Sequence, residues 1–200
     1  MPYNLVIIIG FLASALCLPL YGQQWPADTF QTSTAQPFLP QKLQKHTATV
    51  VLFLDPDCPV TQKYGATLRK LYKKWQEEDV AVVAVYPVVD IDSAAVAEFA
   101  QAYQFDFTHV LDPKLRLAQH LHARITPEAY ILDSLGQVRY RGAIDNWFYE
   151  LGRYRRVVTK HYVEDALAAY LEGSPLPVTE TEAIGCFIGT GMVEEPHHKP

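Results

Sequence analysis

Two stretches of the chain are continuously apolar and rich in β-branched residues. Each has the length of a strand and lacks the alternation of polar and apolar positions that marks a half-exposed strand. Such runs are typical of strands buried on both faces of a parallel sheet. The two runs are Thr49–Leu54 and Val80–Tyr86. Further strands are predicted at Phe107–Leu111, Glu128–Leu132 and Gln137–Gly142, the last two joined as an antiparallel hairpin by the turn Asp133–Gly136.

Apolar residues at helical spacing fill the intervals between these strands. One helix begins at Pro59, because a proline suits the first helical position, where its missing N–H is not needed. Its apolar positions are Tyr64, Leu68, Leu71, Tyr72 and Trp75. Further helices are predicted from Asp92 or Ser93 to Tyr103, from Pro113 to about His122, and through Val163–Leu171 with Gly173 and Pro175 closing it. This order predicts an α/β fold with a mixed central sheet flanked by helices.

The two ends of the chain differ from this central part. Leu5–Leu20 is a mostly apolar run, slightly short for a bilayer span, and predicts a secretory signal peptide over residues 1–22. An uncleaved membrane anchor is the alternative, and we expect contact with a membrane only in that case.

Residues 23–46 are rich in Gln, Thr and Pro and are predicted to be a leader that lies over the domain or is flexible. The domain is expected over residues 47–173, followed by a tail over 174–200 that carries Cys186. The predicted location is periplasmic or secreted.

Composition limits the possible partners. The chain has 200 residues, of which 49% are hydrophobic, so one domain with a real core is expected. Its net charge is −5 and its Lys and Arg residues do not cluster. Binding to nucleic acid needs concentrated positive charge, and we therefore exclude it.

Two cysteines remain for chemistry if Cys17 is removed with the signal peptide. Cys58 follows a buried strand and directly precedes the helix that begins at Pro59. The unpaired N–H groups at a helix N-terminus favour a thiolate, so Cys58 is a candidate nucleophile. A small buried residue without chemistry is the alternative interpretation of Cys58. Cys186 lies in a short apolar segment of the tail, Ala183–Ile188.

Four segments carry a resemblance to a known family, and the first is Leu52–Pro59, which contains Cys58. Ile125–Thr126–Pro127, directly before the predicted hairpin, resembles the equivalent segment of thioredoxin-like proteins, which implies that Pro127 is a cis-proline and that the Thr126 backbone faces a partner lying against Cys58. Asp133–Gly142 resembles the hairpin of redoxins of the alkyl hydroperoxide reductase/thiol-specific antioxidant group. Glu180–Cys186 resembles the C-terminal Gly-Cys motif of a peroxiredoxin-like subgroup. The resemblance covers about residues 47–171 and implies a thioredoxin-like fold.

The chain departs from two patterns of that family. A Cys-x-x-Cys pair is absent, because Asp55 and Thr61 stand at the two positions three residues from Cys58. The Pro-x-x-x-Thr/Ser-x-x-Cys motif of peroxiredoxins is also absent. A mixed disulfide on Cys58 therefore needs a distant thiol for its release, and Cys186 is the candidate resolving cysteine. We expect an exported thiol–disulfide oxidoreductase or peroxiredoxin-like redoxin, with Cys58, Cys186, Thr126 and Pro127 as site residues and a protein thiol, a protein disulfide or a small peroxide as partner.

Two other functions remain open at this point. The first is a metal-binding or assembly factor, with copper as the metal, that uses Cys58, Cys186 and a histidine. Against it, His120 and His122 are two residues apart and diverge on a helix. The second is a domain without catalysis in which a Cys58–Cys186 disulfide ties down the tail. We predict no cofactor and no resident metal. Turn and cap roles are expected for Asp55, Asp57 and Asp133, and Trp147–Arg156 is either a partner surface or a segment packed over the sheet.

Overall fold

The computed structural model describes residues 24–189, so the predicted signal peptide over residues 1–22 lies outside it. The central sheet has seven strands in the order β2-β1-β5-β4-β3-β7-β8. β3 pairs parallel with β4 and antiparallel with β7, so the predicted mixed sheet is confirmed. The strands are β1 (Phe30–Thr32), β2 (Pro37–Phe38), β3 (Ala48–Phe53), β4 (Val80–Tyr86), β5 (Thr108–Leu111), β7 (Glu128–Asp133) and β8 (Val138–Gly142).

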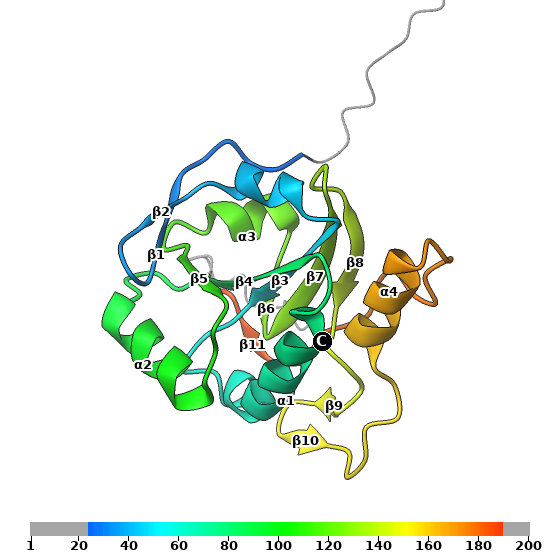
Figure 1. The fold of residues 1–200 in the computed structure, drawn as a ribbon. Coiled ribbons are helices and arrows are strands. Elements are labelled where there is room, and N and C mark those ends of the chain that lie inside the picture. Colours follow the sequence, from blue (N-terminus) through cyan, green and yellow to red (C-terminus); the bar gives the residue numbers. More distant parts are fainter. Residues whose placement is uncertain (1–23, 190–200) are drawn as a thin grey trace, which may run out of the picture.

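Helices cover both faces of the sheet (Figure 1). One face packs against α1, α2 and α4, and the other against α3 and the 3-10 helix η1. Alternate residues of the central strands point to opposite faces: Val50 and Leu52 to the first, Val51 and Phe53 to the second. The helices are η1 (Pro40–Lys45), α1 (Pro59–Trp75), α2 (Ser93–Tyr103), α3 (Arg116–Leu121) and α4 (Tyr162–Leu171). In the described part of the chain, no helix combines the length and apolar character needed to cross a membrane.

α3 begins later than its sequence predicts. Periodicity predicts a helix from Pro113, but the helix starts at Arg116 and Leu115 has a left-handed backbone with φ of 55°. The carboxylate of Asp112 accepts hydrogen bonds from the backbone N–H groups of Arg116, Leu117 and Ala118, at 2.8, 2.9 and 2.9 Å. These N–H groups have no partner within the helix, so the buried Asp112 defines where α3 begins.

The segment before β3 adds to the sheet. β1 pairs antiparallel with both β2 and β5, which places the predicted leader at an edge of the central sheet. Trp25, Phe30 and Leu43 are buried on the face covered by α3. Three isolated apolar residues produce no periodic pattern, and this is why the sequence does not indicate strands here.

Two small sheets complete the fold. β9 (Phe148–Glu150) and β10 (Arg153–Tyr154) form a hairpin within the aromatic and basic insertion. β6 (Ile125–Thr126) pairs with β11 (Cys186–Phe187) from the tail. The tail reaches β11 by running along β8, where the backbone of Arg141 exchanges hydrogen bonds with Thr179 and Thr181. Part of the predicted tail is therefore a structural element of the domain.

Candidate functional site

Cys58 lies where the loop after β3 meets the N-terminus of α1. The loop is held by two hydrogen bonds to Asp55: its backbone carbonyl accepts the Cys58 N–H at 3.1 Å, and its carboxylate accepts the Asp57 N–H at 2.9 Å. Cys58 has an extended backbone and precedes Pro59, the first residue of α1, as predicted. Its side chain is 1% exposed. The turn therefore holds the sulfur at the end of a helix of 17 residues, where unpaired N–H groups favour negative charge.

Thr126 and Pro127 face Cys58. The peptide bond between them is cis, as the resemblance implied. The thiol of Cys58 donates a hydrogen bond to the backbone carbonyl of Thr126, with 3.1 Å between sulfur and oxygen. The Cys58 thiol therefore lies directly against the residue that precedes the cis-proline.

Cys186 reaches the same position through β11. In the antiparallel pairing of β11 with β6, Cys186 lies opposite Thr126 and Phe187 opposite Ile125. The Thr126 hydroxyl donates to the Cys186 carbonyl at 3.4 Å, and the Ile188 N–H donates to the Arg124 carbonyl at 2.9 Å. The structure thus brings together all four predicted site residues. Their two sulfurs are unbonded, and the two thiols are close enough for each to shift the pKa of the other.

The two thiols differ in acidity. Burial raises the pKa of Cys58, but hydrogen bonds from the Cys186 thiol and from Thr61 and Val60 outweigh it, and the pKa falls below its ordinary value. Burial raises the pKa of Cys186 to about 12, and the hydrogen bond to Cys58 and the negative charges of Cys58 and Asp55 act in the same direction. Cys58 is therefore the thiol that ionises first, and Cys186 keeps its proton while Cys58 is a thiolate.

Thr61 is a site residue that sequence reasoning missed. In the sequence it stands out only as the residue that replaces the second cysteine of Cys-x-x-Cys. Its side chain is completely buried in the first turn of α1, and its hydroxyl has no hydrogen-bond partner within the described residues. The hydroxyl is therefore available to donate to the Cys58 thiolate, and this lowers the pKa of Cys58. A threonine three residues after a cysteine at a helix start is the signal that points to this role.

Replacing Thr61 with valine is expected to raise the pKa of Cys58. The change removes the hydroxyl but keeps the shape of the side chain and the backbone N–H. A hydrogen bond to a charged group contributes about 1.5–3 kcal/mol, so we expect an upward shift of roughly one pKa unit. The pH dependence of Cys58 alkylation measures it, in a chain that carries Cys186→Ser. Thr61→Ser is the control that keeps the hydroxyl, and an unchanged curve for Thr61→Val would show that the hydroxyl does not act on the sulfur.

The other candidate groups lie apart from the two sulfurs or have structural roles. Asp133 accepts hydrogen bonds from the N–H groups of Leu135 and Gln137 and from Arg139, which is the turn role expected for it. His109 is buried and bonds to the hydroxyl of Tyr86. Within residues 24–189 no three His, Cys, Asp or Glu side chains are arranged to hold a metal ion. This finding gives no support to the alternative of a copper site.

Solved structures confirm a thioredoxin-like fold. A hypothetical protein from Sinorhizobium meliloti 1021 is similar with a TM-score of 0.74 and 22% identity, over 84% of this chain and 92% of that one. An uncharacterized conserved protein from Geobacillus kaustophilus has a TM-score of 0.73 and 24% identity, over 84% and 90%. A secreted Mycobacterium tuberculosis disulfide oxidoreductase homologous to E. coli DsbE has a TM-score of 0.52 and 18% identity, over 74% and 96%. These identities establish the fold alone.

Sequence families give a more specific answer than the solved structures. No curated protein matches the chain. The AhpC/TSA family matches residues 21–141, which is more than half of the chain and includes Cys58, Thr126 and Pro127 but ends before Cys186. The predicted redoxin relationship is confirmed at this level, and it supports a thioredoxin-fold redox function. This chain belongs to the AhpC/TSA family.

Proposed function

We propose that this protein is a thiol–disulfide oxidoreductase that exchanges disulfides with protein partners through Cys58 and Cys186. The observation that best supports the proposal is the convergence of both cysteines on Thr126: its carbonyl accepts the Cys58 thiol, and its backbone pairs with Cys186. The two residues are far apart in the sequence, yet their thiols are close enough for each to shift the pKa of the other. A second thiol within reach is what a cysteine without a Cys-x-x-Cys partner needs to release a mixed disulfide.

The proposed reaction has two exchange steps. The Cys58 thiolate attacks one sulfur of a partner disulfide, so that a Cys58–partner bond forms, the partner's disulfide breaks, and its other sulfur leaves as a thiolate that takes up a proton. Cys186 then loses its proton and attacks the Cys58 sulfur. The Cys58–Cys186 bond forms and the second partner sulfur leaves. The partner gains two electrons, the protein loses two, and the reverse sequence oxidises a dithiol.

A protein disulfide fits the site better than a peroxide. Cleavage of an O–O bond by a thiolate leaves a hydroxide, and preorganised positive charge stabilises such a leaving group. Among the described residues, the groups that lower the pKa of Cys58 are a thiol, a hydroxyl and backbone N–H groups, and none is a cation. Exchange between sulfurs places the negative charge on sulfur, a softer and more polarisable atom than oxygen, and a thiolate is a weaker base than hydroxide. A thiolate leaving group therefore needs no such cation. We therefore assign the disulfide, rather than the small peroxide, as substrate.

The proposal extends to the location and the boundaries of the protein. A thiol pair that cycles through a disulfide fits an oxidising compartment outside the cytoplasm. We propose that the protein acts in the periplasm or after secretion, with residues 1–22 as its signal peptide. Residues 23–46 would then be the start of the mature chain, 47–173 its redox domain and 174–200 the segment that supplies Cys186.

A single-turnover reaction tests this function. The reduced protein is mixed with insulin as a protein disulfide and, separately, with hydrogen peroxide, and the remaining thiols of each component are counted over time. We expect the protein to lose two thiols for each insulin disulfide reduced, and to react more slowly with peroxide at equal concentration. A faster reaction with peroxide would favour a peroxidase, and persistence of both thiols in the presence of insulin would contradict the proposal.

A further inference from the structure

The strand that carries Cys186 lies beside the sulfur that a partner must reach, because Cys186 pairs with Thr126 and the Thr126 carbonyl accepts the Cys58 thiol. Resting on the proposed function, we propose that β11 occupies the binding position of the partner, and that an extended, cysteine-containing segment of a partner protein binds by displacing β11 from β6. The partner segment then pairs with Ile125–Thr126 in place of β11. The tail then has two roles: it occupies the position of the substrate when no partner is bound, and it supplies the resolving thiol.

The pairing geometry supports a peptide as the occupant. β6 pairs with β11 through its backbone, and the residue of β11 opposite Thr126 is a cysteine whose thiol interacts with Cys58. A partner cysteine must occupy the same place to be attacked by the Cys58 sulfur. Backbone pairing to a strand edge is available to any extended segment, because main-chain hydrogen bonds do not depend on the side chains. β11 thus presents a cysteine to Cys58 in the way that a bound partner would.

Burial of Cys58 shows that β11 must leave before a protein can react. Cys58 is 1% exposed while β11 is in place, and attack requires contact between its sulfur and a sulfur of the partner. The Gly185 backbone packs so closely that a Cβ added there would lie 2.1 Å from the Thr126 carbonyl oxygen. No polypeptide can pass between these two backbones. The close contact of Gly185 with Thr126 therefore makes exchange with β11 the route by which a polypeptide can pair with Thr126 beside Cys58.

β11 is held in a way that permits this exchange. Its paired strand has only two residues, and the side chain of Phe187 is 85% exposed and adds little burial. The anchors on either side are Ala183 and Ile188, each 8% exposed. A short strand with few buried contacts opens at a lower free energy than the core of the same protein. The free energy needed to detach β11 from β6 is therefore small compared with the free energy of unfolding the domain.

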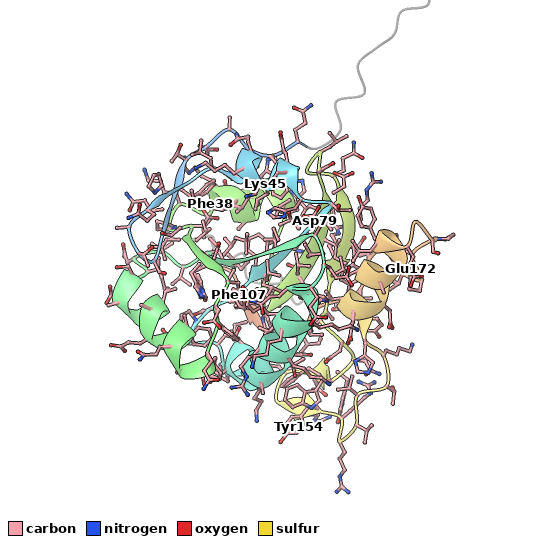
Figure 2. All side chains as sticks on the ribbon, viewed as in Figure 1. Phe38, Lys45, Asp79, Phe107, Tyr154 and Glu172 are labelled. Atoms are coloured by element: carbon pink, nitrogen blue, oxygen red, sulfur yellow. The ribbon has the colours of Figure 1, made fainter. Side chains whose placement is uncertain are left out.

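The surroundings of β11 offer contacts for a polypeptide. A cavity of about 950 Å³ lies beside it, lined by Gly185 and Phe187 on the side of β11 and by Tyr149 and Leu151 of the β9–β10 hairpin. Leu151 is 64% exposed and Tyr149 51%. The hairpin projects away from the central sheet with Tyr154 at its outer side (Figure 2). Exposed aromatic and aliphatic side chains beside the strand edge that β11 would vacate are typical of a surface that binds protein.

Displacement also orders the two chemical steps. Cys186 leaves the site together with β11, so the mixed disulfide between Cys58 and the partner forms while the resolving thiol is absent. Return of β11 brings the Cys186 thiol to the Cys58 sulfur and takes the backbone position of the partner. The attack that expels the partner sulfur therefore coincides with the loss of the partner's hydrogen bonds to β6.

The test uses full-length chains in which Cys186→Ser leaves Cys58 as the reacting thiol of the site. Gly185→Val is designed to displace β11 through the close contact with Thr126. Ile188→Asp is designed to displace it independently, by placing a charge at the buried anchor that follows β11. Gly189→Val is the matched control, because a Cβ at Gly189 meets no atom within 4 Å. Circular dichroism confirms that each variant is folded.

Two activated disulfides with the same leaving group serve as probes. One is dithiodipyridine, and the other is the heptapeptide of residues 183–189, linked through its cysteine to thiopyridine. Loss of peptide pairing is measured with a third probe, the same peptide N-methylated at the isoleucine equivalent to Ile188, whose N–H bonds to Arg124. Release of thiopyridone from each probe, after subtraction of the release by a Cys58→Ser/Cys186→Ser chain, gives the rate at Cys58.

We expect Gly185→Val and Ile188→Asp to raise the rate with the peptide by about tenfold or more over the Cys186→Ser chain, and Gly189→Val to leave it unchanged. In the displaced variants, N-methylation is expected to slow the peptide by about tenfold, equivalent to ~1.4 kcal/mol. If Cys58 reacts with dithiodipyridine, but neither displacement of β11 nor N-methylation changes the rate with the peptide, the inference is overturned and the proposed function stays intact. No reaction of Cys58 with any probe would overturn both.

Discussion

Replacing Cys58 with serine is expected to abolish thiol–disulfide exchange, with a fall in rate of about a thousandfold or more. The reason is that no other thiol of the site can take its place. Cys186 is the other thiol of the site, and burial raises its pKa above the ordinary value, so it is a poor source of thiolate at neutral pH. The measurement is the rate of insulin reduction with a chemical dithiol as the final reductant.

The Cys58→Ser chain should remain folded, which makes the result specific. Serine is close to cysteine in size, and its hydroxyl can donate to the Thr126 carbonyl as the thiol does. Thermal unfolding of the reduced proteins is the control, and we expect similar midpoints. A variant that is folded and still reduces insulin at the original rate would remove Cys58 from the mechanism.

Replacing Cys186 with serine is expected to stop turnover while preserving the first step. The Cys58 thiolate still attacks the partner, but the mixed disulfide has no second thiol to release it, so multiple-turnover insulin reduction should fall by about a hundredfold or more. The covalent Cys58–insulin complex should accumulate and be visible on a non-reducing gel.

The Cys186→Ser variant distinguishes a protein that exchanges disulfides from one in which the Cys58–Cys186 disulfide is purely structural. If the Cys58–Cys186 bond served only to tie down the tail, Cys58→Ser and Cys186→Ser would lower the stability of the oxidised protein equally, and neither would form a complex with insulin. If the two cysteines exchange disulfides with a partner, only Cys186→Ser forms the complex. The double variant Cys58→Ser/Cys186→Ser is the control that shows the complex depends on Cys58.

The central part of the fold followed from the sequence because its signals are local. All six residues of β3 are buried, so the strand is a continuous apolar run that no polar position interrupts. α1 begins at Pro59 and α2 is capped by Asp92, whose carboxylate accepts the Ala94 N–H at 2.9 Å. Each of these features is fixed by neighbouring residues, and each was found where the pattern predicted it.

The elements that were missed depend on contacts between distant residues. β1 and β2 have three and two residues, and their pairing with the sheet edge is not encoded in any periodic pattern. The start of α3 is set by one buried carboxylate, Asp112, that a pattern of apolar positions does not register. The hairpin β9–β10 is short and largely exposed, so neither strand alternates for long enough to be recognised.

The sequence predicts which residues belong to the site, but it does not predict how they are arranged. Cys58, Thr126 and Pro127 were identified by their places beside predicted elements and by family resemblance. Cys186 was identified as a tail cysteine that can reach the site, but its place in β11 depends on a pairing of two residues with β6, 60 positions away. The role of Thr61 depends on burial, and the sequence alone does not state that its hydroxyl lacks another partner.

The central claim is that Cys58 and Cys186 form one reversible redox pair. Its most direct measurement is the single-turnover reaction of the reduced protein with insulin, read by peptide mapping of the sulfur bonds after acid quenching. We predict a Cys58–Cys186 disulfide in an amount equal to the insulin disulfide lost, preceded by a Cys58–insulin bond and reversed by a dithiol. Reduction of insulin without a Cys58–Cys186 bond, or a Cys58–Cys186 bond that a dithiol does not open, would contradict it.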